Sequence, residues 1–303
     1  MLAYIVSLAT FVGFFMLLAI ALNLQWGMTG MVNFGIAGFY ALGAYTSGIL
    51  SSKLGLPVGL AMMVAVLAGL AAGAALALLS GRLRDDYLAI VTLGFGEIVR
   101  LIILNEDQIT EGPRGLRIAE QPLAGWVSVE NYPLLYLGLV VLAVAVAFAL
   151  SETIRRAPMG RVLRAIREDE LVASVLGKAV LRHKIRIFAI GGGIMGLAGA
   201  LYAHYVQNIS PDVFLPMVAI FIWMSVIVGG AGNNWGLLLG AGIVMVLLEG
   251  SRFIGDIAPW IDAEKLSAGR IILIGVLLIV TLHLRPQGLI PEPRYRNKFQ
   301  RKS

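Results

Sequence analysis

Few residues in this chain have the types and spacing that catalysis requires. Its three histidines, His183, His204 and His283, lie far apart, and no H-E-x-x-H or G-x-S-x-G pattern occurs. The absence of cysteine excludes disulfides, thiolate nucleophiles and thiolate metal ligands. A phosphate-binding loop is also missing, because Gly177-Lys178 precedes alanine and has no glycine five residues before it. We therefore expect a chain that is not an enzyme and holds no metal, ATP or other cofactor itself.

Charged residues within apolar stretches are the second kind of candidate. Glu97 and Arg100 lie in the segment YLAIVTLGFGEIVRLIIL. A lone charge at mid-membrane costs on the order of 3 kcal/mol on insertion scales, so each is expected to have a partner. Residues three apart share a helix face, so the two side chains can pair with each other. The pair could fix helix register as a buried ion pair, or line a translocation path.

Two segments rich in glycine and asparagine are the third kind. Residues 27–45 read GMTGMVNFGIAGFYALGAY, and residues 229–236 read GGAGNNWG. Glycine and asparagine tolerate left-handed backbone conformations, so each segment could be a turn or a helix break that exposes amide groups to a cavity. Asn33, Phe34 and Asn233 are the candidate pathway residues from these segments.

A charged insert at residues 158–184, PMGRVLRAIREDELVASVLGKAVLRHK, separates two apolar stretches. After a Pro-Met-Gly break, residues 161–176 are predicted to form an amphipathic helix that ends at Gly177. Such a helix could lie on anionic lipid or in a groove of a cytoplasmic protein, and its acidic triplet favours the protein. The candidate docking residues are Arg161, Arg164, Arg167, Glu168, Asp169, Glu170 and Gly177, and the apolar stripe is Leu163, Ile166, Val172, Ala173 and Leu176.

Composition predicts the fold class. Hydrophobic residues make up 58% of the 303 positions, charged residues 14%, and the mean hydropathy is +0.85. Repeated apolar runs of about 20 residues predict an all-α polytopic membrane protein, a single domain over residues 1–303 with about nine spans and a range of eight to ten. The predicted spans are 3–24, 31–50, 56–79, 87–104, 133–150, 187–207, 213–230, 236–250 and 270–285.

The charge distribution predicts orientation. Nine Lys or Arg residues fall between positions 155 and 186, and six lie from position 285 onward, whereas the loop 105–131 carries five acids and two arginines. By the positive-inside rule, a loop at about 155–186 and a basic tail at about 286–303 face the cytoplasm, and the acidic loop faces outward. Both basic clusters adjoin spans, which indicates contact with membrane lipid and argues against a nucleic-acid partner for a net charge of +6.

Several segments in order resemble the LivM-type permease subunits of branched-chain amino acid importers. These segments are RLRDDYLAIVTLGFGEIVRLII at 82–103, GRVLRAIREDELVASVLGKAV at 160–180, AIGGGIMGLAGALYAHYVQNISPDVF at 189–214, the glycine pattern at 229–241 and LRPQGLI at 284–290. The segment 27–45 is closer to the LivH-like partner permeases of the same importers.

The resemblance implies a multi-pass subunit of a bacterial or archaeal cytoplasmic (inner) membrane importer that works by alternating access. It implies four kinds of partner: a second, LivH-like permease, two cytoplasmic ATPases that bind ATP and Mg, an extracytoplasmic substrate-binding protein, and lipid. The coupling loop of the family seats in an ATPase groove and corresponds here to residues 161–177. A permease for urea or amides, aromatic acids or simple sugars, and a self-sufficient secondary carrier, are the alternatives.

Overall fold

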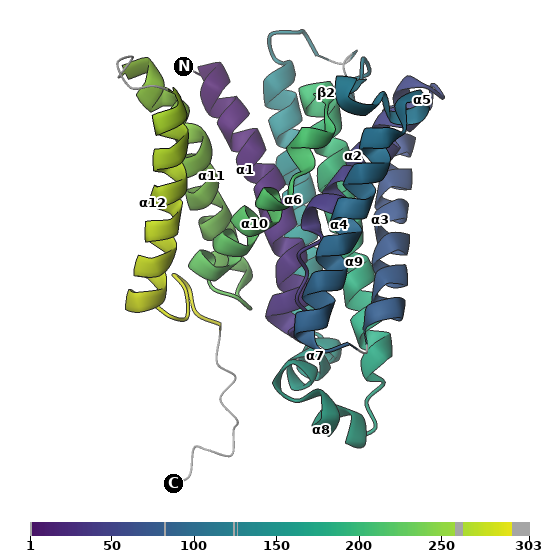
Figure 1. The fold of residues 1–303 in the computed structure, drawn as a ribbon, viewed down its shortest axis with the longest axis vertical. Coiled ribbons are helices and arrows are strands. Elements are labelled where there is room, and N and C mark those ends of the chain that lie inside the picture. The colour runs from purple at the N-terminus through teal and green to yellow at the C-terminus, as the bar shows by residue number, and fades with distance from the viewer. Residues whose placement is uncertain (1, 82, 124, 126, 258–262, 293–303) are drawn as a thin grey trace.

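A computed structural model describes residues 2–81, 83–123, 125, 127–257 and 263–292. Within these residues, each of the nine predicted spans corresponds to a helix (Figure 1). These helices are α1 (Leu2–Leu22), which continues as the π-helical turn η1 (Asn23–Gly27), α2 (Ile36–Ser52), α3 (Val58–Ser80), α4 (Asp85–Asn105), α6 (Tyr132–Arg156), α9 (Val180–Val206), α10 (Pro216–Gly229), α11 (Asn234–Ile257) and α12 (Ala263–Leu284).

Length and composition make this an all-α polytopic membrane protein. Five helical stretches are long and apolar enough to cross a membrane, and three shorter apolar helices accompany them. The five are 3–27, 58–80, 85–105, 132–156 and 180–206, and the shorter ones are 216–229, 234–250 and 268–284.

The connecting segments collect at two opposite ends of the bundle. The short helices α7 (Pro158–Glu168) and α8 (Glu170–Val175) lie at one end with the segment that follows α12. The other end carries α5 (Asp107–Thr110), the turn η2 (Gly112–Arg114) and a pair of two-residue strands, β1 (Leu116–Arg117) and β2 (Asn208–Ile209). The strands pair antiparallel, with Leu116 opposite Ile209. The basic insert and the acidic loop therefore lie at opposite ends, as their charges predict. The predicted basic tail lies, from residue 293 onward, outside the described residues.

Helix α9 is the central helix, and glycine allows its neighbours to approach closely. Of the residues in its most apolar 18-residue stretch, 67% are buried, compared with 17% in the corresponding stretch of α4. A Cβ built on Gly69 of α3 would lie 2.3 Å from the Gly192 carbonyl oxygen, and one built on Gly199 would lie 2.0 Å from that of Tyr40. The glycine-rich spacing at 192–196 therefore packs helices against each other, as small residues do within membranes.

Replacing Gly43 with alanine is expected to destabilise the bundle. A Cβ at this position of α2 would lie 2.1 Å from the Gly196 carbonyl oxygen, so α2 and α9 would have to separate. Overpacking of this kind costs about 1–3 kcal/mol and should lower the melting temperature in detergent. The control is Gly94→Ala on α4, where nothing lies within 4 Å of the added Cβ. Equal melting temperatures for the two variants would contradict the prediction.

Some predicted helix ends are wrong. The span predicted at 213–230 is a 3₁₀ turn, η4 (Pro211–Phe214), followed by α10, because Pro216 occupies the first turn of α10 and lacks the N–H that would continue a preceding helix. The spans predicted at 236–250 and 270–285 are also too short. Helix α11 continues to Ile257 and α12 begins at Ala263, because a helix need not end where its apolar run ends.

Candidate functional site

The glycine and asparagine segment at 27–45 is a helix break. Helix α1 widens into the π-helical turn η1 up to Gly27, the chain is irregular from Gly30 to Phe34, and α2 begins at Ile36. Gly30 has φ +79°, a conformation that glycine adopts without the steric penalty of a side chain. Of the two readings of this segment, the helix break is therefore correct.

Protein groups satisfy the polar atoms at this break. The buried Asn33 amide donates to the Gln25 side-chain oxygen at 2.7 Å, and its own oxygen accepts from the Gly35 N–H at 2.7 Å. The Trp223 indole donates to the Asn33 carbonyl at 2.9 Å, and the Gln25 amide donates to the Phe188 carbonyl at 3.1 Å. Buried backbone groups need such partners, so Asn33 supports the break in this conformation instead of facing an open cavity.

Phe34 belongs to an aromatic cluster beside the break. Its ring stacks on Trp223 with centroids 5.0 Å apart, and Trp26 lies 4.6 Å from Trp223 on a tilted plane. The Phe34 N–H donates to the Thr92 hydroxyl at 3.0 Å, which joins the break to α4. Phe34 and Trp26 remain partly exposed, so this cluster is the part of the break that can meet a solute or another subunit.

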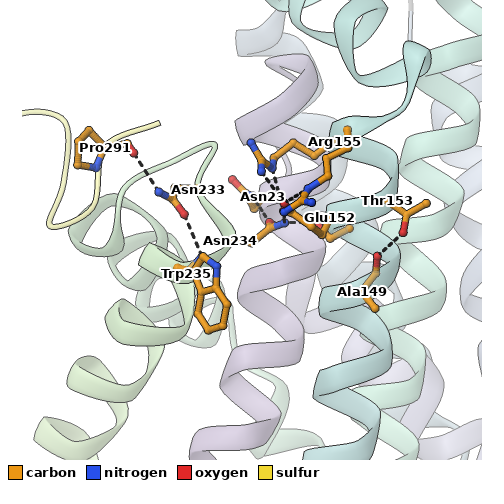
Figure 2. A network of polar contacts seen from close by, with 11 residues as sticks. Asn23, Ala149, Glu152, Thr153, Arg155, Asn233, Asn234, Trp235 and Pro291 are labelled. Carbon is orange, nitrogen blue, oxygen red and sulfur yellow. Dashed lines mark hydrogen bonds and ion pairs between the residues drawn. The ribbon is translucent and has the colours of Figure 1, made fainter. Parts of the chain in front are cut away.

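The second glycine and asparagine segment is the turn between α10 and α11. Gly230 and Gly232 have φ values of +109° and +83°. Asn233 accepts from the Trp235 N–H at 3.0 Å and donates to the Pro291 carbonyl at 3.0 Å (Figure 2). Asn233 thus begins α11 and holds the segment after α12, which are supporting contacts.

A buried polar network that no sequence motif marks surrounds Asn234. Its side-chain oxygen accepts from the Asn23 amide at 3.1 Å and from the Ser151 hydroxyl at 2.9 Å. Its amide donates to Glu152 at 3.0 Å (Figure 2). Asn23 also accepts from the Gly232 N–H at 2.8 Å. The network joins α1, α6 and α11 at the end of the bundle that carries α7. Polar residues at the ends of apolar runs are the signal that could have identified it.

Glu152 is the charged centre of this network. Arg155 contacts it at 2.5 Å and Arg156 at 2.6 Å, in i,i+3 and i,i+4 positions along α6. The Glu152 side chain is only 17% exposed. Two arginines of the same helix therefore balance the Glu152 charge, and Asn234 adds a hydrogen bond from α11.

Glu97 and Arg100 form the pair that their spacing predicts. The guanidinium approaches the carboxylate at 2.5 Å and donates from a second nitrogen at 3.0 Å. The side chains are 38% and 16% exposed, respectively, on the least buried spanning helix. This chain alone therefore does not enclose the pair, and α4 presents it on an open face.

The charged insert is two short helices, so the prediction of one helix over 161–176 is wrong at Asp169. That residue has an extended backbone (φ −157°, ψ 108°) and accepts from the Val172 N–H at 2.9 Å. It is the N-cap of α8, a position that aspartate favours. Gly177 ends the second helix with φ +75°, in the left-handed conformation that the sequence predicts.

The apolar residues of the two short helices differ in exposure. Leu163 of α7 packs into the core of the bundle, and Ile166 is buried with Ala173 of α8 and Val180 of α9. On the α8 side, Ala173 is buried, but large apolar side chains are 53–79% exposed. The exposed residues are Leu171, Val172, Val175 and Leu176. The predicted stripe is therefore divided, and only α8 presents a large apolar surface.

The charged candidates of the insert are divided in the same way. Arg161, Glu168, Asp169 and Glu170 are exposed, whereas Arg164 and Arg167 are partly buried. Glu170 also contacts the ammonium group of Lys184, a buried residue, at 2.5 Å, and Lys184 donates to the Gly81 carbonyl at 3.1 Å. These contacts fix the base of α8 to α9 and to the end of α3.

A cavity of about 250 Å³ lies between α1, α2, α9, α10, α11 and α12. Its walls are mainly aromatic and aliphatic, with Glu249 and Arg270 as the charged lining residues. Glu249 lies in α11 and Arg270 in α12. The aromatic lining residues are Phe11, Phe14, Phe15, Tyr40, Tyr202 and Phe221.

Comparison with known proteins decides what this bundle is. The family model described as branched-chain amino acid transport system / permease component matches residues 4–282. The chain belongs to this permease family. The permease is 33% identical to the high-affinity branched-chain amino acid transport system permease protein LivM of Salmonella typhimurium, covering 97% of this chain and 72% of that protein. None of the solved structures matches it significantly.

Two further relatives indicate the type of permease. The probable LivM of Methanocaldococcus jannaschii is 31% identical, covering 92% of this chain and 91% of that protein. The LivH permease protein of Escherichia coli K12 is 25% identical, covering 91% of each. The permease is thus a LivM-type chain, despite the LivH-like reading of residues 27–45.

Proposed function

We propose that this permease is the LivM-like subunit of an ATP-driven importer of branched-chain amino acids in a bacterial or archaeal cytoplasmic membrane. The observation that carries the proposal is 33% identity to LivM over 97% of the chain. The transport cycle is alternating access, in which the bundle opens to one side of the membrane and then to the other. The energy comes from ATP bound with Mg by two separate ATPase subunits.

The exposed apolar residues of α8 support the assignment of an ATPase docking site. Four large apolar side chains at this short helix outside the spans are more than half exposed among the described residues. An amphipathic helix that lies in a groove of a partner buries such a surface. The docking residues are then the α8 apolar face together with the exposed Arg161, Glu168, Asp169 and Glu170, and this end of the bundle faces the cytoplasm.

The open face of α4 supports a second permease as a neighbour. An ion pair in contact with lipid is unfavourable, so a protein surface or an aqueous path covers Glu97 and Arg100 in the assembled transporter. A LivH-like permease placed against α4 supplies the protein surface. It also supplies the aqueous path, because the translocation path then runs between the two permeases. The opposite end, with β1 and β2, receives the extracytoplasmic binding protein.

Reconstitution of the complete transporter tests the function. Proteoliposomes that contain this permease, a LivH-like permease and both ATPases are expected to accumulate radiolabelled leucine only with binding protein outside and ATP within. Liposomes with the permease alone should not accumulate leucine. Uptake by the permease alone, driven by an ion gradient, would instead identify a secondary carrier. ATP-driven uptake of urea, an aromatic acid or a simple sugar in place of leucine would reassign the substrate.

A further inference from the structure

Arg167 is directed toward the bundle, although the three-residue spacing of Arg161, Arg164 and Arg167 suggests a common docking role. One guanidinium nitrogen donates to the Gly27 carbonyl, and another contacts the Glu292 carboxylate at 2.7 Å. The Arg167 side chain is 27% exposed. Its charge is therefore already used within this chain and is not available to an ATPase in this conformation.

The first partner of Arg167 is the end of the first spanning helix. Gly27 is the last residue of η1, and the last carbonyls of a helix lack intrahelical partners. A cation that binds such a carbonyl also interacts favourably with the negative end of the helix dipole. The Arg167 side chain runs along Gly30, where an added Cβ would lie 3.4 Å from its Cγ. Arg167 thus caps α1 at the point where the helix breaks.

The second partner, Glu292, is fixed over the turn between α10 and α11. The Leu289 N–H donates to the Val228 carbonyl at 2.9 Å, and the Ile290 N–H donates to the Gly229 carbonyl at 3.1 Å. A Cβ on Gly232 would lie 2.8 Å from the Glu292 carboxyl carbon. The segment after α12 is thus held to this turn by backbone hydrogen bonds, and Glu292 projects from it to Arg167.

We propose that Arg167 is the positioning residue that transmits movement of α7 to the break after α1 and to the α10–α11 turn. Both contacts are charge-assisted hydrogen bonds from one planar group, which fixes distance and direction together. Displacement of α7 moves the Gly27 carbonyl and Glu292 in the same direction. The irregular residues 30–34 absorb the change, as hinge segments do in domain rearrangements. The inference rests on the proposed function, because it concerns the step between ATPase movement and opening of the bundle.

The test separates transmission from docking. In complete transporters in proteoliposomes, Arg167→Gln is expected to keep both ATPases bound while leucine uptake per ATP hydrolysed falls by roughly tenfold or more, since each 1.4 kcal/mol of lost coupling is a factor of ten. Glu292→Gln keeps the bond to Gly27 and should cause a smaller fall. Arg167→Lys, which keeps the charge but not the fork, should be intermediate.

Arg156→Gln is the matched control. It removes another cytoplasmic-end arginine that pairs with a carboxylate, but Arg156 is 72% exposed and Glu152 keeps Arg155. Uptake per ATP should be unchanged. Loss of the ATPases from the Arg167→Gln complex would make Arg167 a docking residue, and an unchanged ratio with ATPases bound would show that the contact transmits nothing. Either outcome overturns the inference. If Arg167→Gln does not fold, Glu292→Gln decides alone, since unchanged uptake per ATP in that variant also overturns it.

Failure of the proposed function gives a different result from failure of this inference. If the wild-type complex did not accumulate leucine with ATP in the same assay, the functional assignment would be wrong whatever the variants did. If the wild-type complex accumulates leucine and the Arg167 variants show the same uptake per ATP hydrolysed, the proposed function stands. Arg167 is then a structural contact that transmits no movement.

Discussion

Replacing Val175 and Leu176 with aspartate is expected to abolish co-purification of the ATPase subunits while the permease still inserts and folds. Both side chains are largely exposed, at 79% and 69%, so their loss removes little from the core of the bundle. Burial of a valine or leucine side chain contributes about 1.5–3 kcal/mol, so losing both would weaken an interface by roughly 3–6 kcal/mol. Each 1.4 kcal/mol is a factor of ten, so affinity should fall by about 100-fold or more.

The control for this prediction keeps the apolar surface and changes only its shape. Val175→Ile with Leu176→Met should leave ATPase binding within a few-fold of wild type, because apolar substitutions of similar volume are tolerated best. Size-exclusion chromatography and unfolding titrations of the permease alone check that the aspartate variant is folded. A folded aspartate variant that still retains the ATPases would refute docking through α8.

Deleting the whole insert would be a poorer test than the sequence suggests. Residues 161–177 read as one docking helix, but Leu163 packs into the core of the bundle, Ile166 is buried with Ala173 and Val180, and Arg167 caps η1. The deletion would therefore remove core contacts together with the docking surface. The point substitutions on α8 avoid this confusion, because they touch only exposed side chains.

The spans could be predicted because the membrane imposes one dominant rule. Backbone groups in hydrocarbon must be paired within a segment, so apolar length alone identifies helices. Charge at the loops then gives their relative side, which the opposite positions of α8 and α5 match. The pairing of Glu97 with Arg100 follows from helix periodicity alone. These predictions required no knowledge of tertiary contacts.

The features that were wrong or not anticipated depend on contacts between distant segments. The direction of Arg167 is set by Gly27 and Glu292, which lie 140 and 125 residues away, so its local spacing with Arg164 could not reveal it. The division of the insert at Asp169 depends on one capping hydrogen bond to Val172, in a segment whose composition equally suits a continuous helix.

The network around Asn234 illustrates the same limit. Its partners come from α1 and α6, through Asn23, Ser151 and Glu152. Each of these residues, taken alone, is an ordinary polar residue near the end of an apolar run. Only the packing of α1, α6 and α11 at one end of the bundle makes them a single buried cluster.

Replacing Asn33 with leucine is expected to destabilise the permease strongly and to abolish transport through loss of the helix break. Leucine is close to asparagine in size but cannot pair with Gln25 or with the Gly35 N–H, both of which are at or near full burial. Each unsatisfied buried group costs about 1–3 kcal/mol, so the free energy of unfolding should fall by roughly 2–6 kcal/mol. Unfolding titrations in mixed micelles measure this change.

The neighbouring variant Phe34→Leu distinguishes support of the break from contact with the solute. Its backbone bond to Thr92 does not depend on the side chain, and an apolar replacement should cost less than about 1.5 kcal/mol. If Asn33→Leu unfolds as readily as Phe34→Leu, the hydrogen bonds at the break do not support the fold. If Phe34→Leu keeps wild-type stability but loses uptake, the aromatic cluster with Trp223 acts in transport itself. The Asn33 backbone carbonyl accepts a hydrogen bond from the Trp223 indole whatever the side chain at position 33.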